Sequence, residues 1–315
     1  MAVNDTPARS SGPGPGSGRA FALVVASALA AVAFTEAATC AAGDAAPATL
    51  DRRALRLVFN EDFAAPPSFY DAARHAKGRW KTNYWFGVQD SRAEKGWEPR
   101  TLVPNGEMQY YGDPATGLSP FEWKDGVLTI AARPNPRRDR TTNGLPYLSG
   151  LITTEKSFAF TYGYVEARIA FPSQKGLWPA FWLLPLPKSR NGQLQPPGSH
   201  EIDIFESVGE PGKLYFTWFP NLPGNRKQGD GMPLQTGFDL SAFHTYGVMV
   251  SPQAITWYLD GRQVRRVANK DFHEPLYLLL NMAVGGKWPG APTSATQWPA
   301  RMRIDYVRAY RLAGR

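Results

Sequence analysis

The sequence predicts an all-β domain in which antiparallel strands form a sandwich or a barrel. Apolar and polar residues alternate with a period of two in several segments, and no long helical period competes with them. The 315 residues include 30 Gly and 28 Pro, which interrupt long helices. Asp-Gly pairs follow or precede the alternating segments and are typical of tight hairpin turns.

Two segments illustrate this pattern. Residues 164–171 place Val165 and Ile169 on one face of a strand and Glu166 on the other. Residues 255–259 alternate in the same way and end at Asp260-Gly261. We therefore expect a strand in each segment and a hairpin after the second one.

Composition excludes several classes of protein. Hydrophobic residues make up 43% of the chain and charged residues 20%, which is typical of a folded globular protein. One Cys and four His are too few for a disulfide scaffold or a thiolate metal cluster. The net charge is +8, but its basic residues are scattered and no nucleic-acid-binding motif is present, so we expect no nucleic acid partner. Attraction to an acidic polysaccharide and a merely solvated basic surface both remain open.

The first 54 residues differ from the rest. Residues 20–34 are apolar and uncharged, which is short for a membrane span but suits the core of a signal peptide. We expect residues 1–42 to be a signal peptide, residues 43–54 a linker and residues 55–312 the catalytic domain. The mature protein would then be secreted or periplasmic in a bacterium, with no membrane span after processing.

The most informative stretch is Glu201-Ile-Asp-Ile-Phe-Glu206. In a strand, Glu201 and Asp203 project from one face, whereas simple counting puts Glu206 on the other. A one-residue bulge at Ile204-Phe205 would return Glu206 to the acidic face, and bulges are frequent beside active sites. We therefore expect three carboxylates on one face.

Three clustered carboxylates suit glycoside hydrolysis. Mutual repulsion should keep at least one of them protonated near neutrality, and the reaction needs one ionised and one protonated carboxyl. The alternative is a solvated or calcium-binding acidic edge. Trp178 and Trp182 lie just upstream and share a strand face, where indole rings either stack on sugars or fill the core.

The chain resembles glycoside hydrolase family 16, which includes laminarinases, lichenases and agarases. Its Glu-x-Asp-x-x-Glu signature matches Glu201, Asp203 and Glu206, and the similarity covers about residues 55–311. Further matching segments, in order, are Leu57-Val-Phe-Asn-Glu-Asp-Phe63, Arg79-Trp-Lys-Thr82, Asn105-Gly-Glu-Met-Gln-Tyr110, Tyr162-Gly-Tyr-Val-Glu-Ala-Arg168, Phe243-His-Thr-Tyr246, Ile255-Thr-Trp-Tyr-Leu-Asp-Gly261, Asn281-Met-Ala-Val-Gly-Gly286 and Ile304-Asp-Tyr-Val-Arg308.

The resemblance implies a concanavalin A-like β-jelly roll with a concave substrate cleft and internal attack on a polysaccharide. It implies Glu201 as nucleophile, Glu206 as general acid/base and Asp203 as partner of Glu201, in a retaining mechanism that needs no catalytic cofactor. Alternatives are a hydrolase or transglycosylase of a sulfated or acidic galactan, and a non-catalytic carbohydrate-binding protein on the same fold. We expect a monomer.

Two positions depart from the usual laminarinase pattern. Leu151 stands where an Arg is usual, and Thr217 or Trp218 stands where a His is usual. These differences favour an exopolysaccharide or a mixed β-1,3-1,4 glucan over strict laminarin. We expect Trp178, Trp182, Trp218 and Glu107 to contact substrate, although a structural hydrogen bond would also explain Glu107.

Members of this family often bind one structural calcium ion far from the chemistry. In this chain the resemblance places its ligands at Asp305 with Glu61 or Asp62. Carboxylate oxygens are suitable ligands for calcium.

Overall fold

The computed structural model describes residues 48–87, 96–190, 193–195, 198, 200–222 and 228–313. The predicted signal peptide and residues 43–47 of the predicted linker lie outside these ranges. Within them, no helix is both long and apolar enough to span a membrane.

Strands dominate the described chain, and the helices are single 3₁₀ turns. The helices are η1 (Arg52–Ala54), η2 (Glu98–Arg100), η3 (Val103–Asn105), η4 (Pro114–Thr116) and η5 (Arg140–Thr142). The strands are β1 (Leu55–Glu61), β2 (Gln109–Tyr111), β3 (Phe121–Lys124), β4 (Val127–Pro134), β5 (Tyr147–Ser149), β6 (Leu151–Thr153), β7 (Gly163–Ala170), β8 (Leu177–Pro185), β9 (Lys188–Arg190), β10 (Gln193–Gln195), β11 (Glu201–Glu206), β12 (Lys213–Phe219), β13 (Asp230–Gln235), β14 (His244–Val250), β15 (Ala254–Leu259), β16 (Arg262–Ala268), β17 (Leu276–Val284) and β18 (Ala300–Leu312).

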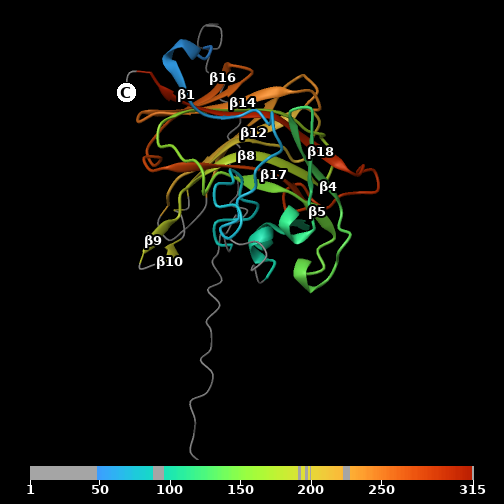
Figure 1. Ribbon diagram of the computed structural model, residues 1–315. Coiled ribbons are helices and arrows are strands. Elements are labelled where there is room, and N and C mark those ends of the chain that lie inside the picture. Colours follow the sequence, from blue (N-terminus) through green and yellow to red (C-terminus); the bar gives the residue numbers. More distant parts are fainter. Residues whose placement is uncertain are drawn as a thin grey trace, which may run out of the picture.

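The strands form two packed sheets, which confirms the predicted antiparallel sandwich (Figure 1). The larger sheet has the order β16-β15-β14-β7-β18-β4-β5-β2, with β1 on β18 and β3 on β4. The smaller sheet has the order β13-β12-β11-β8-β17-β6, and β9 and β10 form a separate hairpin. Pairing is antiparallel except between β2 and β5.

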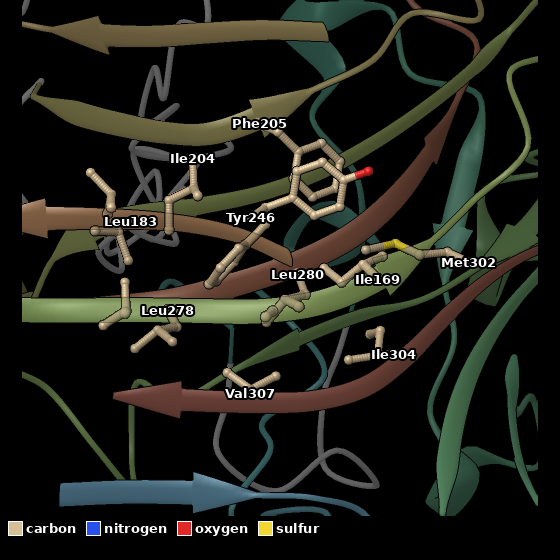
Figure 2. Close-up of a cluster of buried hydrophobic side chains, with 14 of the residues drawn as sticks. Ile169, Leu183, Ile204, Phe205, Tyr246, Leu278, Leu280, Met302, Ile304 and Val307 are labelled. Atoms are coloured by element: carbon tan, nitrogen blue, oxygen red, sulfur yellow. The ribbon is translucent and has the colours of Figure 1, made fainter. Parts of the chain in front are cut away.

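The core lies between the two sheets. Both predicted alternating segments are strands, β7 and β15, and their apolar faces point into this core. Figure 2 shows how Ile169 of the larger sheet and Leu183 and Ile204 of the smaller sheet meet in one apolar layer. The hairpin predicted after β15 also forms, because Asp260 (φ 48°) and Gly261 (φ 75°) adopt the left-handed conformations of a two-residue turn.

A layer made of residues 81–87 and 96–111 covers part of the smaller sheet on the side away from the core (Figure 1). We call it the cover. Its Tyr84, Leu102 and Tyr111 pack against the outward side chains of β8 and β17. Lys81 fastens it, because Nζ of this buried lysine donates to Glu155 Oε2 at 2.7 Å and to the Tyr84 carbonyl at 2.8 Å.

The described end of the predicted linker contacts the larger sheet. The Leu50 amide donates to the Gly261 carbonyl at 2.9 Å, and the Arg52 guanidinium donates to both carboxylate oxygens of Glu166, at 2.9 and 2.6 Å. The Glu166 side chain is fully buried and also accepts from the hydroxyls of Tyr164 and Tyr310. Arg52 therefore holds the N-terminal segment on the outside of the larger sheet.

Candidate active site

The three predicted carboxylates lie on one face of β11, and the predicted bulge puts them there. Pairing with both neighbouring strands shifts register between Asp203 and Glu206. Ile204 and Phe205, which are adjacent in sequence, both point into the core. The carbonyl oxygen of Asp203, at the start of the bulge, accepts a hydrogen bond from the Trp257 indole at 2.8 Å, so a residue of the opposite sheet anchors the bulge.

Register on the neighbouring strand gives the spacing of the acids. Glu201, Asp203 and Glu206 pair with Phe219, Thr217 and Tyr215, which are successive positions of one face of β12. Measured along β12, the first and last acid are therefore four residue steps apart, which corresponds to about 13 Å between α-carbons on a flat strand. The two long glutamate side chains must lean toward each other over Asp203 if both are to reach one bond.

The Glu206 carboxylate has a separate neighbour for each oxygen. The Trp178 indole donates to Oε1 at 3.0 Å, and the Thr217 hydroxyl donates to Oε2 at 3.4 Å. Trp178 also contacts Trp288 edge to face, with ring centroids 5.6 Å apart. The end of the acidic row at Glu206 is therefore bordered by aromatic rings.

The Glu201 end of the row meets the cover. Trp182 lies on the same face as the acids but is buried under Tyr84, and its indole donates to Asn281 Oδ1 at 2.7 Å. Burial is the main cause of the raised pKa values of Tyr84 and Tyr277, and the negative charge of Glu201 also contributes. Both phenols are therefore neutral hydroxyls.

Glu107 is buried in the cover. Its carboxylate accepts from the Leu102 amide at 3.0 Å, from Asn105 Nδ2 at 3.0 Å and from Gln109 Nε2 at 2.6 Å. Burial raises its pKa, and these hydrogen bonds oppose the rise. Its described bonds are structural, and a contact between Glu107 and substrate stays a prediction.

The structure distinguishes between Thr217 and Trp218. Thr217 pairs with Asp203 and faces the carboxylates, whereas Trp218 pairs with Ile202 and packs against the core. The Trp218 indole donates to Asp230 at 3.3 Å. Because side chains alternate along β12, Trp218, which was predicted to bind sugar, lies on the core face of the sheet. Thr217 lies on the face that carries the acids. Leu151 is buried and packs under the cover.

The predicted calcium ligands each have hydrogen-bond partners in the structure, and calcium binding stays a prediction. Asp305 accepts from Arg168 Nη1 at 2.6 Å, and Glu61 accepts from the Trp80 indole at 3.3 Å. Asp62 accepts from the Ala64 amide and from Asn60. Among the residues that the structure describes, no group of three or more His, Cys, Asp or Glu could hold a metal ion.

Sequence reasoning did not identify Asn281 and Trp288 as the partners of Trp182 and Trp178, nor Tyr84 and Tyr277 as phenols whose pKa values the charge of Glu201 helps to raise. All four reach the site through contacts between distant parts of the chain. The available signal was aromatic composition, which does not say which rings meet.

Comparison with known proteins adds to this geometry. A family model described as Glycosyl hydrolases family 16 matches residues 122–308. The endo-1,3-1,4-beta-glycanase EglC of Rhizobium meliloti (strain 1021) is 37% identical over 270 residues, which are 84% of this chain and 53% of that protein. The chain therefore spans about half the length of this relative.

Two further proteins are similar over more of their own length. The beta-glucanase of Rhodothermus marinus is 32% identical over 225 residues, which are 66% of this chain and 75% of that protein. The laminarinase catalytic domain from Thermotoga maritima MSB8 superposes with a TM-score of 0.62 at 30% identity, covering 82% of this chain and 98% of that chain.

Proposed function

The chain belongs to glycosyl hydrolases family 16, and we propose that it is an endo-acting hydrolase of internal β-1,3 or mixed β-1,3-1,4 glucosidic bonds in a glucan or exopolysaccharide. The observation that carries the proposal is the bulge in β11, which aligns Glu201, Asp203 and Glu206 on one face. A structural acidic edge would not need a bulge that sends two adjacent apolar side chains into the core.

We propose a retaining double displacement. The ionised Glu201 attacks the anomeric carbon while Glu206 gives its proton to the departing glycosidic oxygen, which leaves a glycosyl ester on Glu201. Glu206 then takes a proton from water as the water attacks the same carbon and releases Glu201. Asp203, between them on the strand, orients Glu201. No step uses a metal ion.

Glutamine substitutions test these roles. Glu201→Gln and Glu206→Gln should each reduce hydrolysis by at least about a thousandfold, because each removes a proton donor or nucleophile while keeping the side-chain shape. Thermal unfolding should change little. Glu122→Gln, at an exposed ion pair with Arg301 on the larger sheet, is the matched control and should keep wild-type activity. Substantial activity in either active-site variant would refute the mechanism.

A polysaccharide panel with product sizing tests the substrate. Lichenan and bacterial exopolysaccharide should be cut to oligosaccharides, and NMR should detect the retained anomer first. Products from laminarin alone would overturn the preference for mixed linkages, and products from carrageenan or agarose alone would favour the galactan alternative. Sugar binding without cleavage of any polymer would favour the non-catalytic alternative. We also propose secretion or export to the periplasm as a monomer, in keeping with the predicted signal peptide.

A further inference from the structure

Trp178 and Trp182 are a natural comparison on one strand. They lie four residues apart on the same face of β8, and each indole nitrogen donates one short hydrogen bond. The acceptor of Trp182 is the amide oxygen of Asn281, whereas the acceptor of Trp178 is Oε1 of Glu206. One tryptophan therefore contacts the group proposed to move the proton, and its counterpart does not.

The chemistry of the indole restricts the protonation of Glu206. An indole N–H can only donate, so the oxygen it faces must be an acceptor. Because the carbonyl oxygen of a carboxylic acid is a better acceptor than its hydroxyl oxygen, the hydrogen bond from Trp178 favours the proton of Glu206 on Oε2. The neighbour of Oε2 is the Thr217 hydroxyl at 3.4 Å, which can donate to an ionised carboxylate or accept from a protonated one.

Packing keeps the Trp178 indole in place. Trp288 contacts it edge to face, and Trp288 is in turn packed against Tyr215 with centroids 4.7 Å apart. On its other side is Gly286, where an added β-carbon would lie 3.3 Å from the indole ring. The donor is thus oriented before substrate arrives.

Charged and titratable groups near this end of β11 lie on β11 itself, on β12 and in the turn that contains Glu210. Glu201 and Asp203 share the strand. Lys213, on β12, is paired with Glu210 at 2.6 Å, and Tyr215 has a pKa raised mainly by burial. Thr217 does not ionise. Neither the Trp178 indole nor the Thr217 hydroxyl titrates in the working range.

From this geometry we propose that Trp178 is a positioning residue for Glu206, which fixes Oε1 as acceptor and leaves Oε2, beside Thr217, to carry the proton delivered to the leaving group. The proposal rests on the proposed function of Glu206 as general acid. It adds that the hydrogen bond from Trp178 stabilises the ionised carboxylate of Glu206 and so lowers its pKa. The basic limb of the pH–rate profile, which reports the loss of the Glu206 proton, therefore lies at lower pH than it would without Trp178.

The test compares Trp178→Phe with Trp182→Phe in the full chain. Each change keeps an aromatic ring and deletes one N–H. Trp178→Phe should move the basic limb of the kcat profile upward by roughly one pH unit, since a hydrogen bond to a charged group is lost, and should lower kcat about tenfold. Trp182→Phe should leave the limb in place, whatever it does to KM.

Thr217→Val is the second variant and decides the matter if Trp178→Phe does not fold. It should move the same limb upward by a smaller amount, because the 3.4 Å contact is longer. The inference is overturned if the limb stays in place or moves to lower pH in a folded variant. Wild-type protein that cuts no polysaccharide would instead refute the proposed function, so the two failures are distinguishable.

Discussion

The outward face of the smaller sheet has two unlike halves, and the acidic strand lies between them. Over β8 and β17 the cover packs down, so that β17 is buried on both faces along its whole length. On β13 burial alternates, and the outward Pro233 and Gln235 are exposed. β11 has the covered strand β8 on one side and, on the other, β12 followed by β13 at the edge of the sheet.

This difference separates stability from function on a single sheet. The covered half is held by buried hydrogen bonds and by the buried ion pairs Lys81–Glu155 and Arg100–Asp113, which would be costly to break. On the other side of β11, Thr217 and Tyr215 of β12 are themselves buried, and exposed outward side chains begin at Pro233 and Gln235 of β13. At one end of the row, the charge of Glu201 acts on the buried phenols Tyr84 and Tyr277, and at the other end Glu206 accepts from the Trp178 indole.

The largest expected effect on stability comes from the ion pair that fastens the cover. Lys81→Met keeps the length of the side chain but removes the buried ammonium from Glu155 and from the Tyr84 carbonyl. Breaking one partner of a buried pair should lower the free energy of unfolding by about 3 kcal/mol, measured by chemical denaturation.

Lys188→Met is the matched control, because Lys188 pairs with Glu274 at 2.8 Å but is 75% exposed. It should change the free energy of unfolding by less than about 0.5 kcal/mol. Equal losses in the two variants would mean that the covered half is not specially anchored.

A smaller effect is expected from Glu107→Gln. The amide replaces one accepting oxygen with a donor, in a site where three donors already converge. Leaving one buried donor unpaired should cost about 2 kcal/mol of unfolding free energy, while hydrolysis stays within about twofold of wild type. A large rise in KM with unchanged stability would instead establish Glu107 as a substrate contact.

The smallest effect is the pH dependence of that same carboxyl. Because burial raises the pKa of Glu107 above 4.5, folding takes up a proton just above that pH. Its contribution to stability is therefore greatest at low pH and is lost as pH rises through the folded pKa. The free energy of unfolding, measured by chemical denaturation at several values from pH 4 to 7, should fall with rising pH in the wild type. Glu107→Gln should reduce this dependence on pH. Identical slopes would contradict a raised pKa.

The sequence was most informative where the pattern is local. The bulge in β11 follows from three acids and three apolar residues that must face opposite sides, so counting along six residues was sufficient to predict it. The β15–β16 hairpin follows from Asp260-Gly261 for the same reason.

Contacts set by distant segments could not be predicted in this way. Whether Thr217 or Trp218 faces the acids depends on the register between β11 and β12, which no residue of β12 alone encodes. The partners of Asp305 and of Trp182 come from strands far away in the sequence. The aromatic composition favoured a sugar-binding site, but it did not indicate which rings the cover would bury.

The ion pair between Arg52 and Glu166 bears on where this folding unit starts. A shortened protein beginning at Leu55, the first residue of β1, would keep every strand of both sheets. The buried Glu166 carboxylate would nevertheless lose the Arg52 guanidinium and keep only the hydroxyls of Tyr164 and Tyr310 among these partners. The end of the β15–β16 hairpin would also lose the backbone hydrogen bond from Leu50. A truncation intended to isolate this domain should therefore start no later than Ala48, whose carbonyl accepts from the Gln263 amide of the same hairpin.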